Sequence, residues 1–266
     1  MATAAVNGTN LYFEETGNGT SLLLIHGMCG DARVWEDQVR RLSAHFRCIA
    51  YDRRGHTRSP LGEITRRSVE LHADDAAALI QALHIGPCLM MGSSGGARIG
   101  VDVLRRYPQL VTGAVLSEPP LFALDPEGAR AFVAEIKTRL EHAVAAGGSR
   151  AAVDAFFDCV CPGLWRTLDE ARRERYRANH VELFGDLRMQ PYQITPNDLS
   201  NTQTPCLVIR GSESHPFLRH VAELLVRALP HARLLELAGA GHVTYAEKPE
   251  EFARAVTEFG QRSGAS

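Results

Sequence analysis

A glycine-flanked serine is the residue best suited to nucleophilic chemistry in this sequence. Ser94 occupies the centre of the run Gly92 to Gly96, which fits the pattern G-x-S-x-G. An apolar stretch of strand length, Cys88 to Met91, precedes this run, and a stretch of helical period follows it. In such a sharp turn the hydroxyl stands above the sheet. The pattern therefore predicts Ser94 as a nucleophile, with the Gly95 amide at a helix N-terminus, where it can stabilise negative charge.

A second glycine-rich loop could complete a site for an oxyanion. The stretch Ile25 to Gly30 lies at the end of an earlier predicted strand, and an amide in such a loop can supply the other half of the hole. We favour the Met28 amide as this donor, with Gly27 as the alternative. His26 is interpreted as a structural residue.

A histidine late in the sequence is the candidate general base. His242 follows Gly239 to Gly241, just beyond the last predicted strand. A histidine on a flexible glycine-rich loop can reach the serine, accept its proton and later donate it to the leaving group. The other histidines lie on predicted helices, far from strand ends or beside proline, so we expect His242 to serve Ser94.

Regular elements must hold these residues in place, and apolar runs of strand length alternate with stretches of helical period along most of the chain. This alternation predicts an α/β fold, in which helices cover both faces of a doubly wound, mostly parallel sheet. The predicted strands are Leu22 to Ile25, Cys48 to Tyr51, Cys88 to Met91, Ala114 to Leu116, Cys206 to Ile209 and Arg233 to Leu237. The predicted helices are Val34 to Ser43, Val69 to Leu83, Ala97 to Tyr107, Pro216 to Leu229 and Pro249 to Phe259. We expect Gly260 to Ser266 to form a frayed tail.

The alternation stops between residues 119 and 204, where the sequence predicts helices without a convincing strand. We interpret 119–204 as a helical lid inserted into a core formed by residues 1–118 and 205–266. The predicted helices of the insertion are Pro126 to Ala146, Ala151 to Val160 and Leu168 to Phe184. Its aromatic side chains could line a pocket above the sheet or pack the insertion's own small core; they are Phe156, Phe157, Trp165, Tyr176, Phe184 and Tyr192.

Taken in order, these motifs are typical of one family. The sequence resembles the serine-nucleophile branch of the α/β-hydrolase superfamily over about residues 11–118 and 204–259. The resemblance depends on His26-Gly27 with Gly30, the run Tyr51 to His56 with Ser59, Gly92 to Gly96, and Gly241-His242. It implies the fold expected above and a Ser-His-acid triad. Thr57 stands where a glycine is frequent in relatives.

The triad acid is missing from its usual place. Relatives carry it in G-x-x-D after a late strand, but the corresponding run, Gly211 to Ser214, ends in a serine, which cannot hold a negative charge. We prefer Glu118, because it ends the strand next to the nucleophile's strand. The stretch Glu118 to Pro120 is also similar to one in zearalenone-type lactonases, which place the acid there. Glu213 is the alternative, one residue short of the usual place but one methylene longer. Glu118 could instead cap a neighbouring helix.

The predicted reaction is hydrolysis of a carboxylic ester or lactone of a small hydrophobic substrate through an acyl-enzyme. This chemistry needs no cofactor and no metal. Dehalogenase and epoxide hydrolase chemistry require a carboxylate nucleophile, which Ser94 is not. The alternatives are hydrolysis of a carbon–carbon bond in ring-cleavage products and a small-molecule binding module with little turnover.

Composition excludes several other partners. The chain of 266 residues carries 29 Lys and Arg against 31 Asp and Glu, a balance that argues against nucleic acid or an anionic membrane as partner. Residues 1–10 carry no secretory signal pattern, and no apolar run approaches the roughly 20 residues needed to cross a bilayer. The six cysteines are scattered, which predicts reduced thiols in a cytoplasmic protein. The oligomeric state is left open.

Overall fold

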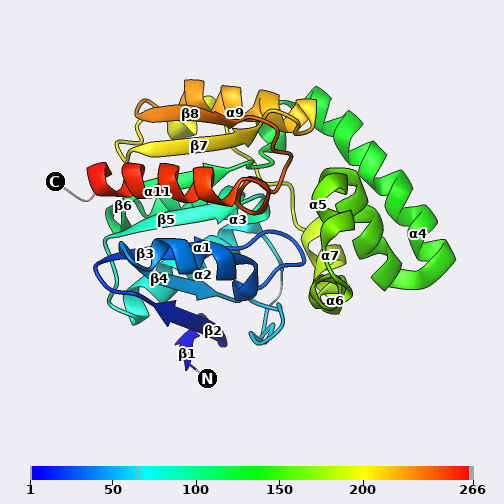
Figure 1. The fold of residues 1–266 in the computed structure, drawn as a ribbon, viewed down its shortest axis with the longest axis horizontal. Helices are drawn as coiled ribbons and strands as arrows, with labels where there is room; N and C mark the ends of the chain where they lie inside the picture. Colours follow the sequence, from blue (N-terminus) through cyan, green and yellow to red (C-terminus); the bar gives the residue numbers. More distant parts are fainter. Residues whose placement is uncertain (1, 65, 264–266) are drawn as a thin grey trace.

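An eight-stranded sheet runs through the molecule (Figure 1), and the computed structural model describes residues 2–64 and 66–263. The strand order is β1-β2-β4-β3-β5-β6-β7-β8. Strands β3 to β8 pair in parallel, whereas β2 is antiparallel to both β1 and β4. The strands are β1 (Ala2–Val6), β2 (Thr9–Thr16), β3 (Thr20–Ile25), β4 (Phe46–Tyr51), β5 (Cys88–Ser93), β6 (Val111–Ser117), β7 (Cys206–Gly211) and β8 (Ala232–Leu237).

Helices cover both faces of this sheet, which confirms the predicted fold class. In Figure 1, α1 and α11 lie side by side in front of the strands, and α2 and α3 pack together behind them. Helix α9 packs on β7 and β8. These helices are α1 (Glu36–Leu42), α2 (Val69–Ala82), α3 (Gly95–Arg106), α9 (Pro216–Ala228) and α11 (Pro249–Ser263), with a short α10 (Thr244–Glu247) before the last.

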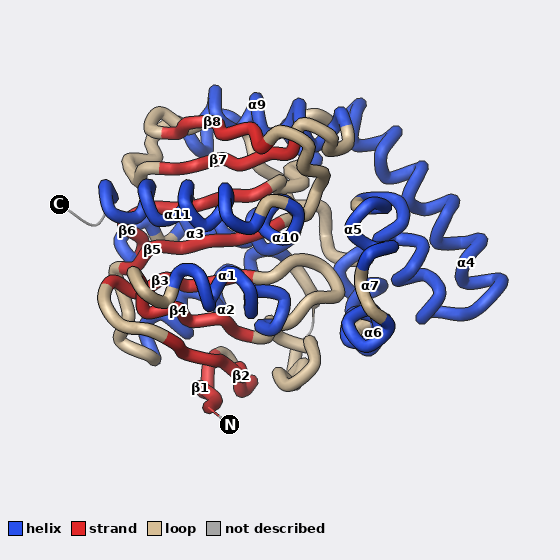
Figure 2. The backbone as a smooth tube through the Cα atoms, viewed as in Figure 1, coloured by secondary structure: helices blue, strands red, loops and turns tan. Residues whose placement is uncertain are grey.

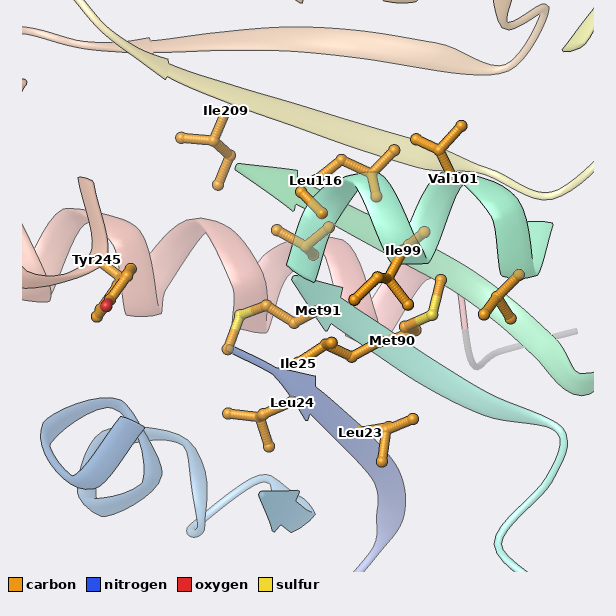
Figure 3. Packing of buried hydrophobic residues seen from close by; sticks show 14 of the residues in the cluster. Leu23, Leu24, Ile25, Met90, Met91, Ile99, Val101, Leu116, Ile209 and Tyr245 are labelled. Carbon is orange, nitrogen blue, oxygen red and sulfur yellow. The ribbon is translucent and has the colours of Figure 1, made fainter. Parts of the chain in front are cut away.

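The core strands are buried on both faces, and this packing holds their ends in place. Figure 3 shows side chains of β3, β5, β6 and β7 packed together with Ile99 and Val101 of α3. Leu23, Met90 and Leu116 have no exposed surface. Burial of each side chain of this size stabilises the fold by about 1.5–3 kcal/mol. The loops that follow these strands therefore start from rigid positions.

Between β6 and β7 the chain forms a helical insert, defined here as α4 to α8. Figure 2 shows α4 to α7 grouped beyond one end of the strands, where one end of α4 meets α9. The insert comprises α4 (Pro126–Val160), α5 (Pro162–Thr167), α6 (Glu170–Ala178), α7 (His180–Leu187) and α8 (Pro196–Leu199). Within the described part of the chain, no helix is both long and apolar enough to cross a membrane.

Several elements differ from those predicted. The expected helices Pro126 to Ala146 and Ala151 to Val160 form one element, α4, which bends at Gly148, where φ is 77°. The expected helix Leu168 to Phe184 is divided at Asn179. The buried Asn179 side chain accepts a hydrogen bond from Thr57 N at 3.0 Å and donates one to Cys29 O at 3.1 Å, and this anchoring to the core separates α6 from α7.

Both ends of the described chain are more regular than expected. No strand was expected over the segments that form β1 and β2. These two strands form a hairpin around Asn7 and Gly8, both with positive φ. An Asn-Gly pair is a typical signal for such a turn. At the other end, α11 continues through Ser263, because Phe252, Val256 and Phe259 bury one face of it. The predicted tail is thus helical over residues 260–263, and its last residues, 264–266, lie outside the described ones.

Candidate active site

Ser94 occupies the sharp turn between β5 and α3. Its backbone is held at φ 53° and ψ −121°, a conformation that costs a non-glycine residue about 1–3 kcal/mol. Its N–H donates to Ser117 O at 2.9 Å. Added Cβ atoms on Gly92 and Gly96 would lie 2.5 Å from Gly96 O and 2.1 Å from Ile25 O. Only glycine therefore fits at these two positions of the motif, and the close packing holds the serine in its strained conformation.

His242 lies beside this serine, with Nε2 at 3.0 Å from Ser94 Oγ. It follows β8 on the loop that begins at Gly239. Glu247, which the sequence analysis did not identify, holds this loop: its carboxylate accepts hydrogen bonds from Gly241 N at 2.8 Å and Val243 N at 3.0 Å. The loop is therefore anchored on both sides of the histidine. The other imidazole nitrogen, Nδ1, is directed towards a carboxylate.

That carboxylate belongs to Glu118, whose Oε2 lies 3.2 Å from His242 Nδ1. Glu118 is fully buried at the end of β6 and has φ 53°. Its N–H donates to Ile209 O at 3.0 Å, so its position depends on the pairing of β6 with β7. Oε1 accepts a hydrogen bond from Gly211 N at 2.8 Å, and Oε2 accepts one from Ser214 Oγ at 2.5 Å. The carboxylate thus has three hydrogen-bond partners and faces the imidazole.

The rival carboxylate lies elsewhere. Glu213 is exposed, and its side chain accepts a hydrogen bond from Ser212 Oγ at 3.2 Å. No contact joins it to His242 among the hydrogen bonds and ion pairs of the described residues. Ser214, which stands in the usual place of the acid, instead donates to Glu118. The structure therefore brings together Ser94, His242 and Glu118 and leaves Glu213 apart.

Two loops meet where an oxyanion would form. Gly95 is the first residue of α3, so its N–H belongs to those without an acceptor inside the helix. A Cβ on Gly95 would lie 3.8 Å from Met28 N, so the two predicted donors are close neighbours. A Cβ on Gly27 would lie 3.2 Å from both Ser94 Cβ and Ser93 O. The absence of a side chain at Gly27 lets this loop approach the serine.

His26 supports the loop and does not contact Ser94. Its Nε2 accepts a hydrogen bond from Arg53 N at 2.9 Å, and Nδ1 lies 2.8 Å from Gly27 O. Burial, together with the charge of Arg53, lowers the pKa of His26 to about 4. The imidazole is therefore neutral near pH 7, with its proton on Nδ1 directed at Gly27 O.

A cavity of about 800 Å³, named here the Ser94 cavity, lies between the core and the helical insert. Ser94, Met28 and His242 line it from the core, and most of its remaining lining residues are apolar. Those on the insert side include Phe132, Ile136, Leu140, Val144, Phe156, Val160 and Phe184.

The aromatic residues of the insert take both of the predicted roles. Phe156, Phe184 and Tyr192 line the Ser94 cavity. Phe157 packs against Trp165 and Tyr176, with ring centroids 4.5 and 4.7 Å apart, within the insert. These three rings also line a smaller cavity of about 40 Å³, and Ser94 and His242 line the same cavity.

Comparison with known proteins identifies the family to which this fold and site belong. Residues 22–255 match the model of the alpha/beta hydrolase family. The chain belongs to this family. The protein is accordingly a hydrolase, as the sequence analysis predicted.

Relatives and solved structures agree with this assignment. This alpha/beta hydrolase is 29% identical to the 2-(acetamidomethylene)succinate hydrolase of Mesorhizobium japonicum over an alignment of 269 residues, which covers 94% of this chain and 91% of the relative. It is 38% identical to the uncharacterized hydrolase YraK of Bacillus subtilis over 123 residues, 46% of this chain and 45% of that protein. The meta-cleavage product hydrolase of Pseudomonas fluorescens IP01 has the same fold, with a TM-score of 0.82 and 22% identity over 99% of this chain and 98% of that one.

Proposed function

We propose that this alpha/beta hydrolase cleaves a carboxylic ester or lactone of a small hydrophobic substrate through an acyl-enzyme. The observation that carries the proposal is the continuous chain of contacts from Ser94 Oγ through His242 to Glu118, at 3.0 and 3.2 Å, beside a largely apolar cavity. Nucleophile, base and acid in this geometry activate a serine hydroxyl. The reaction uses neither a cofactor nor a metal.

In the first half of the reaction, His242 Nε2 removes the proton from Ser94 Oγ, and the oxygen attacks the carbonyl carbon of the substrate. The negative charge that develops on the carbonyl oxygen is stabilised by the Met28 and Gly95 amides. The imidazolium then donates its proton to the leaving alkoxide as the ester carbon–oxygen bond breaks. An acyl group remains on Ser94 Oγ.

In the second half, a water molecule gives a proton to His242 and attacks the acyl carbon. Return of that proton to Ser94 releases the carboxylic acid and restores the enzyme. Glu118 holds the imidazole in the tautomer with its proton on Nδ1 and stabilises its positive form. The hydrogen bonds from Gly211 N and Ser214 Oγ orient the Glu118 carboxylate for this role.

We also propose that residues 119–204 form a cap over a core of residues 1–118 and 205–266. Apolar side chains of α4, among them Phe132, Ile136 and Leu140, line the Ser94 cavity opposite the nucleophile. Such a surface favours the hydrocarbon part of a substrate. The scattered cysteines continue to favour a cytoplasmic location.

The test is labelling with a fluorophosphonate together with hydrolysis of 4-nitrophenyl butyrate. Ser94→Ala should abolish labelling and lower kcat on the order of 10⁶-fold. Ser93→Ala, which removes the neighbouring hydroxyl of the same motif, is the matched control and should keep the label. Near-normal turnover by Ser94→Ala would refute the proposal. Faster turnover of a vinylogous diketone than of any ester would replace it with carbon–carbon bond hydrolysis by the same residues.

A further inference from the structure

An arginine without a carboxylate partner lies next to the proposed nucleophile. Arg98 is four residues after Ser94 on α3, and its N–H donates to Ser94 O at 3.0 Å. Residues four apart share one face of a helix, separated by roughly 6 Å along its axis. Both side chains line the Ser94 cavity. A positive charge is therefore present within one helical turn of the position where an acyl group would be attacked.

No acceptor in the described chain satisfies this guanidinium. Arg98 Nε is buried and lacks a hydrogen-bond partner, and within residues 2–64 and 66–263 no ion pair involves Arg98. The Arg98 guanidinium lies over the ring of Phe122, with Cζ 5.6 Å from the ring centroid. Arg98 as a whole is half-buried. Arg53 and Arg54, the fully buried arginines of the core, differ because each forms an ion pair with an aspartate at 2.7 Å, although Arg53 Nε also lacks a hydrogen-bond partner. Charges withdrawn from water are ordinarily paired, so the unpaired Arg98, which faces the cavity, indicates a partner that arrives from the cavity.

Each acidic residue that lines the same cavity forms an ion pair with a residue other than Arg98. Asp186 Oδ2 lies 2.7 Å from Arg53, while Asp186 Oδ1 is buried without a hydrogen-bond partner, and Glu141 lies 3.7 Å from Lys137. Burial lowers the pKa of Arg98, and the negative charge of Asp186 partly offsets this effect. The Asp186 carboxylate nevertheless lies more than 4.0 Å from the Arg98 guanidinium, too far for an ion pair. Among the described residues, the cavity lining therefore carries positive charge without an ion-pair partner at Arg98 and at the exposed Arg188, although the chain as a whole carries a net charge of −2. Of these two arginines, Arg98 is the one within a helical turn of Ser94.

We propose that Arg98 binds a carboxylate of the substrate, which makes the substrate class an ester or lactone with a free carboxylate a few bonds from the scissile carbonyl. This inference rests on the proposed function and narrows it. A guanidinium can donate two parallel hydrogen bonds to a carboxylate, which fixes both the distance and the orientation of the bound group. The apolar residues of the cavity then contact the hydrocarbon between the two functional groups.

The experiment compares two esters that differ only in this charge: mono(4-nitrophenyl) adipate and its methyl ester. The measured quantity is the ratio of their kcat/KM values. Wild-type enzyme should favour the acid, and Arg98→Met should reduce the ratio about 10- to 100-fold, chiefly through KM for the acid, because a hydrogen-bonded charge pair is lost. Arg98→Lys should keep part of the preference. Arg227→Met removes an exposed arginine of α9 and should leave the ratio at its wild-type value.

Two results would overturn the inference. One is the same ratio in wild type and Arg98→Met, and the other is an equal decrease for both esters, which would assign Arg98 a structural role. If Arg98→Met does not fold, an experiment on wild-type enzyme still tests the inference. Adipate should slow the fluorophosphonate labelling of Ser94, whereas dimethyl adipate, which lacks the charge, should not. Equal effects of the two compounds would refute the inference. Failure of wild type to hydrolyse either ester or to be labelled would instead overturn the proposed function.

Discussion

The assignment of the acid can be tested by removing each of the two candidate carboxylates. The Glu118 carboxylate contacts His242 Nδ1 and accepts hydrogen bonds from Gly211 N and Ser214 Oγ. Loss of the acid from a Ser-His-acid centre lowers kcat about 10⁴-fold, which corresponds to about 5.4 kcal/mol in the activation barrier. We expect this loss in Glu118→Ala. The exposed Glu213 has no contact with the imidazole in the described structure, so Glu213→Ala should change kcat less than twofold.

Stability must be separated from catalysis in this comparison. Glu118→Ala leaves the buried Gly211 N–H without an acceptor, which costs about 1–3 kcal/mol in the free energy of unfolding. Glu118→Gln retains the size of the side chain and an acceptor oxygen but removes the charge. It should lose nearly as much kcat as Glu118→Ala while it loses less stability. The assay is steady-state hydrolysis of 4-nitrophenyl butyrate, with chemical denaturation of each variant.

A second-site change makes the test sharper. Ser214 Oγ lies 2.5 Å from the Glu118 oxygen that faces His242, so an aspartate at this position can approach the imidazole once Glu118 is removed. We expect Ser214→Asp to recover at least tenfold in kcat in the Glu118→Ala background. Turnover by Glu118→Ala within tenfold of wild type, or a larger loss in Glu213→Ala, would refute the reasoning.

Three further predictions concern stability and the cavity. Gly96→Ala should lower the free energy of unfolding by about 3 kcal/mol or more, because the new Cβ would lie 2.1 Å from Ile25 O; an unchanged denaturation midpoint would contradict the packing described for the Ser94 turn. The pKa of His26 falls from 6.5 to about 4 on folding, so between these pH values the unfolded chain binds a proton that the folded chain does not. Stability should be fully present above pH 6.5, and His26 should contribute a decrease of about 3 kcal/mol as the pH falls towards 4, to which the buried His56 and His72, whose pKa values are also lowered, add. Denaturation at several pH values measures this decrease, and a flat profile would count against buried neutral imidazoles. Val144 is an exposed residue of the cavity lining, so Val144→Asp should lower kcat/KM for apolar esters about fivefold with little change in the unfolding midpoint. An unchanged kcat/KM would argue against contact between α4 and the substrate.

Local sequence patterns predicted the core of the fold well. Each of the six predicted strands is present. Most of them are continuous apolar runs such as Leu22 to Ile25, which are long enough only for a buried strand, whereas Arg233 to Leu237 forms the largely exposed edge strand β8. The strand-to-helix turn at Ser94 followed from the motif Gly92 to Gly96 and from the strand and helix patterns on either side of it. The resemblance to the α/β-hydrolase superfamily was confirmed, while the finer similarity to zearalenone-type lactonases stays a prediction.

The helical insert was predicted less accurately, because its boundaries depend on contacts with the core. Asn179 is of a residue type that often ends helices, and it lies at the end of α6 and the start of α7. That signal alone did not decide the boundary, because the Asn179 side chain is anchored by hydrogen bonds to Thr57 and Cys29, more than a hundred residues earlier. Glu247 was missed for a different reason, because its contacts are local. Its carboxylate accepts hydrogen bonds from the N–H groups of Gly241 and Val243, a few residues earlier, and no motif in the sequence marks that contact.

The sequence by itself determined the identities of the candidate nucleophile and base, since Ser94 and His242 stand in short motifs whose backbone requirements are local. Tertiary structure alone decided which carboxylate lies beside His242. Glu118 and Glu213 both follow strands of the sheet, but the pairing of β6 with β7 turns the first inward and leaves the second exposed. Only the folded chain shows that Arg98 lacks a partner, because the pairing of a charge depends on every element packed around it.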